Sequence, residues 1–292
     1  MRVLLATDGS KDANSATEWL TGNLLPADAT LLALTVATLP APPIDAQTMK
    51  DLRDAILADA RRVGEAARAL LARRWPSAEV RVSEGDPREE IVRTAEEWGA
   101  DLVVVGARGL GTVKGFFLGS VSLAVGRYAT CPVLVVKGRP RELKSALVAI
   151  DGSEDSLHAL QVFASFALEE MPRVRLLSVL EALRVPSSAP RFIRAKLRGA
   201  VAQLQQEGRA KAEAVLERAA ASLEGKAGAI ERSIFVGIPA DAIVQAANRD
   251  GIDLVVVGAR GLGGLERLLL GSVSEKVLRA ARCSVLIVKR PR

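Results

Sequence analysis

The chain has 292 residues, 49% of them hydrophobic and 25% charged, which is the balance of an ordinary globular protein with room for two domains. Its net charge is only +6 and its aromatic content 3%. DNA binding needs a denser basic stripe and single-stranded nucleic acid needs exposed aromatic rings, so we expect no nucleic-acid partner. No apolar run approaches the roughly 18 residues of a membrane-spanning helix, and we expect a cytoplasmic protein without a membrane partner.

The first half of the sequence alternates short apolar runs with longer amphipathic segments. In chain order it predicts strands and helices at 2–7, 11–25, 30–36, 47–74, 79–83, 88–98, 102–105, from about Ser120, and 132–137. The strands are continuous aliphatic runs, as in a parallel sheet that is buried on both faces. Right-handed crossovers then give a doubly wound, five-stranded α/β sheet, in which ligands bind beyond the carboxyl ends of the strands where strand order reverses.

The second half of the sequence repeats the first. Three segments recur: DLVVVGARGLG at 101–111 and 253–263, LGSVS at 118–122 and 270–274, and the first strand with its turn at 4–10 and 147–153. The first two pairs lie 152 residues apart and the third 143 apart. We therefore expect two tandem copies of one domain, 1–141 and 142–292, the second longer by nine residues.

The extra residues fall between the second and third strands of the second copy, around 181–208. The basic residues of this region are Arg184, Arg191, Arg194, Lys196 and Arg198. We interpret the region as a solvated helix or a mobile loop; a surface for a partner is the alternative.

A glycine pattern follows the fourth strand of each copy. Gly106 and Gly109 are followed, after nine residues, by Gly119-Ser120, and the second copy has the same spacing. Glycine permits positive φ and close approach of backbone N–H groups to a ligand, and such amides bind anions. Gly119-Ser120 lies where a helix begins, and the unpaired amides of a helix start favour a phosphate.

The same residues have a purely structural interpretation. Glycines after a strand can make a tight turn, a Gly-Ser pair can cap a helix, and Arg108 and Arg260 can be solvated loop residues instead of phosphate ligands. We favour phosphate binding because both halves of the pattern recur with identical spacing in copies that differ elsewhere. The glycine order is the reverse of the dinucleotide-binding pattern and follows the fourth strand instead of the first. The Walker pattern does not occur in the sequence.

The spacing G-x2-G-x9-G-S, the Asp-Gly-Ser after the first strand and the G-x-P loops at 85–87 and 237–239 resemble the universal stress protein family, tandem type. The resemblance implies a five-stranded parallel α/β fold, dimer-like pairing of domains, and membership of an ATP-binding subset. It places Asp8 and Asp151 near the adenine and ribose, and Val36 and Val179 against the adenine.

The candidate nucleotide-binding residues, with the strand-one residue before each aspartate included, form two equivalent sets. They are Thr7, Asp8, Val36, Gly106, Arg108, Gly109, Gly119, Ser120 and Val121, and Ile150, Asp151, Val179, Gly258, Arg260, Gly261, Gly271, Ser272 and Val273.

The expected function is a regulatory, stress-response module that binds ATP in both copies, with Mg²⁺ as companion ion and ADP or AMP as alternative ligands. A slow ATP hydrolase and a non-nucleotide interaction protein are the alternatives, and no catalytic or metal-ligating set is visible. The last strands, 132–137 and 284–289, are apolar and lie at sheet edges. We expect them to pair with each other, or with another chain in a homodimer.

Overall fold

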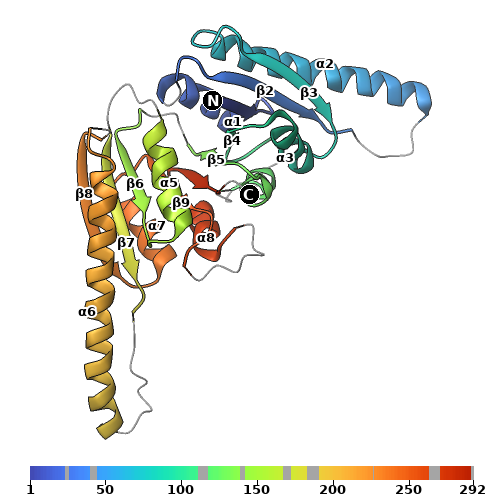
Figure 1. Cartoon of the computed structure of the whole chain (residues 1–292). Coiled ribbons are helices and arrows are strands. Elements are labelled where there is room, and N and C mark those ends of the chain that lie inside the picture. The colour runs from blue at the N-terminus through green and yellow to red at the C-terminus, as the bar shows by residue number, and fades with distance from the viewer. Residues whose placement is uncertain are drawn as a thin grey trace.

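A computed structural model of the chain (Figure 1) describes residues 1–23, 26–39, 45–110, 118–138, 142–166, 172–182, 191–225, 227–262 and 270–290. Within these residues each copy alternates five strands with four helices, as the sequence predicts. The first copy comprises β1 (Arg2–Ala6), α1 (Lys11–Asn23), β2 (Thr30–Ala37), α2 (Ala46–Leu71), β3 (Glu79–Glu84), α3 (Pro87–Trp98), β4 (Leu102–Gly106), α4 (Ser120–Tyr128) and β5 (Val133–Val136). The second comprises β6 (Ser145–Ala149), α5 (Glu154–Ser165), β7 (Arg173–Leu180), α6 (Arg191–Ala221), β8 (Ala229–Val236), α7 (Pro239–Arg249), β9 (Leu254–Gly258), α8 (Ser272–Ala280) and β10 (Ser284–Val288).

Local chemistry sets where the helices begin and end. At the start of α3 the Asp86 carboxylate accepts a hydrogen bond from the backbone N–H of Arg88, and Pro87 occupies the first turn, where a missing N–H costs nothing. Gly99 ends the helix in the left-handed conformation, with φ of 66°. Such caps account for predicted boundaries that lie within a few residues of those found.

The ten strands of the described residues form one sheet, in the order β3-β2-β1-β4-β5-β10-β9-β6-β7-β8. Strands within each copy are parallel, and the two copies join where β5 pairs antiparallel with β10, with Leu134 opposite Leu286. The sequence-based prediction that the last strands pair with each other is confirmed. Because this pairing occupies both strands, a homodimer through the same edges would have to replace it.

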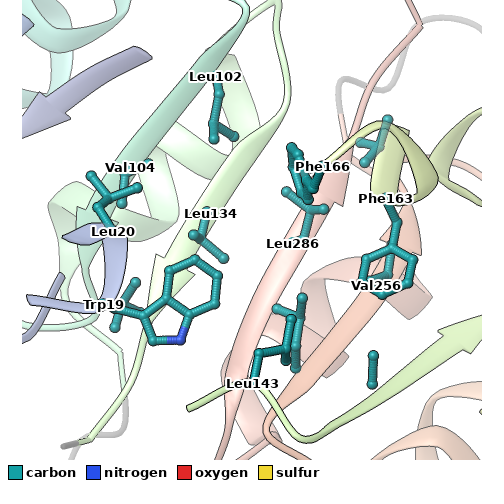
Figure 2. Close-up of a cluster of buried hydrophobic side chains, with 14 of the residues drawn as sticks. Trp19, Leu20, Leu102, Val104, Leu134, Leu143, Phe163, Phe166, Val256 and Leu286 are labelled. Atoms are coloured by element: carbon teal, nitrogen blue, oxygen red, sulfur yellow. The ribbon is translucent and has the colours of Figure 1, made fainter. Parts of the chain in front are cut away.

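Hydrophobic side chains cover both faces of the sheet and continue across the junction of the copies. In β1, Val3 and Leu5 belong to the cluster on one face, and Leu4 to the cluster on the other, as the two-residue period of a strand requires. Figure 2 shows the first cluster where the copies meet, with Trp19 and Leu134 of the first copy near Leu286 of the second. The two copies therefore share continuous cores.

Two buried lysines reach across the junction. Lys137, directly after β5, donates hydrogen bonds to the carbonyls of Leu278 and Ala281 at the end of α8, at 2.5 and 2.7 Å. Lys289, directly after β10, donates in the same way to the carbonyls of Arg127 and Ala129 at the end of α4. Carbonyls at helix carboxyl ends lack intrahelical partners and attract cations, so each copy caps a helix of the other.

The extra residues of the second copy lie partly in α6, which contains 31 residues where α2 contains 26. Arg191, Arg194, Lys196 and Arg198 belong to this helix, whereas Arg184 lies outside the described residues, as do residues 24 and 25 of the predicted helix 11–25. No helix in the described part of the chain is long and apolar enough to cross a membrane.

Candidate functional site

The carboxyl ends of three neighbouring strands bring the first half of each candidate set together. Sheet order places β1 between β2 and β4, with Ala6 opposite both Leu34 and Val105. Thr7 and Asp8 therefore follow β1 beside Val36 near the end of β2 and Gly106 at the end of β4. In the second copy the same edge holds Ile150, Asp151, Val179 and Gly258. The β1–β4 and β6–β9 boundaries are where strand order reverses, the expected ligand position of a doubly wound sheet.

Asp8 joins the end of β1 to the glycine loop after β4. Its carboxylate accepts hydrogen bonds from the backbone N–H of Ser10 and that of Leu110, both at 3.0 Å. Asp151 accepts from Ser153 and Leu262 in the same arrangement, at 2.9 and 3.1 Å. The aspartate thus makes the turn into the first helix and also fixes the position of the loop where a ligand would bind.

Gly106 and Gly258 are glycine because a helix crosses them closely. A Cβ on Gly106 would lie 2.5 Å from the carbonyl carbon of Asp12 in α1, and one on Gly258 would lie 2.7 Å from that of Asp155 in α5. Backbone at that distance cannot yield without moving the helix. These two glycines serve the packing of a helix on the sheet.

Gly109 and Gly261 are glycine because of the aspartates. A Cβ on Gly109 would lie 2.5 Å from Oδ2 of Asp8, and one on Gly261 would lie 2.6 Å from Oδ2 of Asp151. None of these four glycines has a positive φ. These positions are therefore glycine because other atoms lie close to the backbone, and those atoms belong to the protein itself.

The second half of the motif is a helix start without a side-chain cap. Gly119 is the N-cap of α4 and Gly271 that of α8, and neither position has a side-chain capping hydrogen bond. Each glycine donates its own N–H to a loop carbonyl, Gly119 to Ala107 and Gly271 to Ala259, both at 2.8 Å. The next residues, Ser120 and Ser272, are exposed, and Val121 and Val273 are half-buried. First-turn amides have no intrahelical acceptor, so these helix starts suit an anion.

The two arginines between the glycines are ion-paired. Nε of Arg108 lies 2.9 Å from the buried carboxylate of Asp12, and Nε of Arg260 lies 3.1 Å from that of Asp155, which also binds Arg290. Burial opposes ionisation of Asp155, but the hydrogen bonds from Arg260 and Arg290 outweigh it and lower its pKa. Each arginine therefore already compensates a buried acid, whatever charge it also presents to a ligand.

Both halves of the chain match one known protein family. The family model described as universal stress protein family matches residues 1–137 and again 142–289. The chain belongs to the universal stress protein family. A universal stress protein of Mycolicibacterium smegmatis is 29% identical over 99% of this chain and 97% of its own length. Universal stress protein YxiE of Bacillus subtilis is 34% identical over 49% of this chain and 97% of its own.

A solved structure of a universal stress protein from Archaeoglobus fulgidus supports the fold. It matches with a TM-score of 0.62, covering 99% of this chain and 96% of its own, at 22% identity. The doubly wound α/β fold in two tandem universal stress protein domains is thus confirmed.

Some residues that build the site were not singled out from the sequence. Ser122, in the first turn of α4, shares its single hydroxyl hydrogen between the carbonyls of Gly106 and Ala107, and Ser274 of α8 donates to that of Gly258. These bonds fasten the helix start to the end of the fourth strand. The repeated LGSVS segment contained the signal, since its second serine recurs as faithfully as its first.

The loops between the two halves of the motif, 111–117 and 263–269, lie outside the described residues. Among the residues that are described, no group of three or more histidines, cysteines, aspartates or glutamates is placed to hold a metal ion.

Proposed function

We propose that this universal stress protein is a regulatory, cytoplasmic ATP-binding module with one adenine-nucleotide site in each of two domains, 1–141 and 142–292. One observation carries the proposal. In both copies a helix start without a side-chain cap, with an exposed serine in its first turn, adjoins the point where strand order reverses. The family resemblance supports it, because the glycine spacing is that of the ATP-binding subset.

In this proposal the amides of Gly109, Ser120 and Val121, and their counterparts in the second copy, bind the phosphates. The adenine and ribose lie over the ends of the first two strands, by Asp8 and Val36 or Asp151 and Val179. Arg108 and Arg260 add positive charge while they stay paired with their buried acids. Mg²⁺ would be held by phosphate oxygens and water, and ADP or AMP would use the same contacts.

The acids near the site favour binding over rapid turnover. Both oxygens of Asp8 accept hydrogen bonds from backbone amides, and Asp12 is paired with Arg108. A general base needs a carboxylate that can turn to a substrate proton. We therefore propose that any hydrolysis is slow and that occupancy, not turnover, is the signal.

The test uses a charge that the helix tolerates and a phosphate does not. Asp at the first helical position stabilises a helix start, but in the variant Ser120→Asp/Ser272→Asp it would repel a triphosphate. We expect ATP affinity to fall by more than about tenfold, with an unchanged or higher melting temperature. Ser120→Asn/Ser272→Asn is the matched neutral control and should stay within a few-fold of the wild type.

Denatured supernatants of the purified proteins, separated by anion exchange, give a second readout. Co-purified nucleotide in the wild type and its loss in the Asp variant agree with the proposal. Equal ATP affinity in the Asp variant and the wild type would show that the phosphates do not lie at these helix starts.

A further inference from the structure

The long helix of the second copy projects beyond the sheet. The first buried side chain described in α6 is Ala212, which corresponds to Ala60 of α2 at the offset of 152. At this offset the first residue of α6, Arg191, corresponds to position 39, whereas α2 starts at Ala46. The helix of the second copy therefore starts seven residues earlier than that of the first. Figure 1 shows the amino-terminal half of α6 extending past the ends of β7 and β8.

The projecting region has exchanged acids for neutral, apolar or basic residues. Six acids of the first copy stand at corresponding positions in α2 and its N-cap, at the end of β3 and at the N-cap of α3. Asp45, Asp51, Asp54, Asp59, Glu84 and Asp86 become Leu197, Gln203, Gln206, Lys211, Val236 and Ile238. In the first copy these acids have structural uses: Glu84 pairs with Arg53 at 2.6 Å and Asp86 caps α3. Their loss removes local stabilisation, and the net charge changes from −2 over residues 45–62, 84 and 86 to +1 over the matching residues 197–214, 236 and 238.

Apolar side chains are exposed around these positions. Leu204 is 54% exposed, Val236 60% and Ile238 65%. They are continuous with one another, since Val236 pairs in register with Leu180, and a Cβ on Gly208, one turn after Leu204, would lie 3.8 Å from Leu180. We call this surface the ledge; its apolar residues are Leu180, Leu197, Val201, Leu204, Val236 and Ile238.

The sequence that leads into and begins α6, between Glu181 and Glu207, is basic. The 25 residues from 182 to 206 contain five arginines or lysines and no aspartate or glutamate. This stretch supplies five of the six net positive charges of the chain, so the remainder carries only +1. A helix with an apolar stripe and flanking bases is the pattern of a segment that lies at a charged interface.

We propose that the ledge binds the surface of an anionic lipid bilayer, with α6 lying along the headgroups. The exposed leucines would enter the boundary with the acyl chains while the bases meet anionic headgroups. A nucleic acid would use the bases but leave the apolar stripe in water. A second copy laid antiparallel on α6 would bring two basic stretches together. The absence of an 18-residue apolar run bears only on spanning helices and not on this mode of binding.

Co-sedimentation of the full-length protein with vesicles tests the proposal. We expect binding to vesicles of phosphatidylglycerol and phosphatidylcholine, none to phosphatidylcholine alone, and weakening with salt. Leu197→Gln/Leu204→Gln should lower the affinity by about tenfold or more, and Arg198→Gln by about fivefold.

Matched control substitutions outside the ledge show whether an effect on vesicle binding is specific to the ledge. Leu157 of α5 is 37% exposed, as is Leu197, and Arg61 is an exposed arginine of α2. Leu157→Gln and Arg61→Gln should bind vesicles like the wild type. The proposal fails if anionic vesicles do not bind, if neutral vesicles bind equally, or if the ledge variants bind unchanged. It also fails if the leucine variants alter only dimerisation or binding to polyglutamate or DNA.

Discussion

Gly109→Ala should destabilise the first copy through a collision inside the protein. The new Cβ would lie 2.5 Å from Oδ2 of Asp8, about 1 Å inside normal contact, so the carboxylate must turn. That movement strains or breaks its hydrogen bonds with Leu110 and Ser10. With about 1.5–3 kcal/mol for each hydrogen bond to a charged group, we expect the free energy of unfolding to fall by about 2 kcal/mol.

A double-mutant cycle isolates this mechanism. Asp8→Ala alone loses both hydrogen bonds, but it also removes the oxygen with which the Cβ collides. Adding Gly109→Ala to Asp8→Ala should therefore cost less than about 0.5 kcal/mol, which gives a coupling energy of about 2 kcal/mol. Gly22→Ala is the control, because Gly22 lies in α1 with no atom within 4 Å of the added Cβ, and it should be neutral or stabilising.

Urea unfolding of nucleotide-free protein, followed by tryptophan fluorescence, gives the required free energies. All three tryptophans, Trp19, Trp75 and Trp98, lie in the first copy, so the signal reports the copy that carries the substitutions. Additive effects within about 0.5 kcal/mol would refute the assigned contact between Gly109 and Asp8.

Three further predictions concern packing and ionisation. Gly106→Ala should lower the free energy of unfolding in urea by about 2 kcal/mol or more, because its Cβ meets the backbone of α1. Gly119→Ala, whose nearest contact would be 3.3 Å, should lower it by less than about 1 kcal/mol. Equal losses of stability in the two variants would contradict this. Burial lowers the pKa of Lys137 from 10.5 to about 8, so between these pH values the unfolded state holds more protons than the folded state. The free energy of unfolding of the wild type should therefore rise with pH relative to that of Lys137→Met, by up to about 3 kcal/mol. Parallel pH–stability curves for the two proteins would disprove this. Partial burial raises the pKa of the Cys131 and Cys283 thiols to about 11. At pH 8 a disulfide reagent should therefore react about 100-fold more slowly with native than with urea-unfolded protein, and equal rates would contradict this shift.

Most of the fold followed from local pattern. Continuous aliphatic runs such as 102–105 identified the parallel strands, and the caps at Asp86 and Gly99 lie where turn chemistry indicates. The exact repeat predicted two copies, and the apolar last strands predicted their pairing. The antiparallel register of β5 and β10 and the crossing lysines depend on contacts more than 140 residues apart, which no local pattern records.

The sequence predicted where the glycines of the candidate site lie, but it did not predict why these positions must be glycine. Gly106 and Gly109 stand where the motif places them, yet their nearest neighbours are Asp12 and Asp8 of the same chain. The pairing of Arg108 with Asp12 spans 96 residues and was invisible in the sequence. The spacing of glycines can show where another group lies close to the backbone, but it does not show whether that group belongs to a ligand or to the protein.

In the proposed function, each copy binds one adenine nucleotide at the start of its α4 or α8 helix. Titration calorimetry of nucleotide-free protein with Mg·ATP tests it most directly. The proposal predicts saturable heat with two sites per chain, and once Ser272→Asp is introduced alone, one site of wild-type affinity and one weakened by more than about tenfold. Folded protein that shows no saturable heat at millimolar ATP, or a Ser272→Asp variant in which both sites keep wild-type affinity, would contradict it.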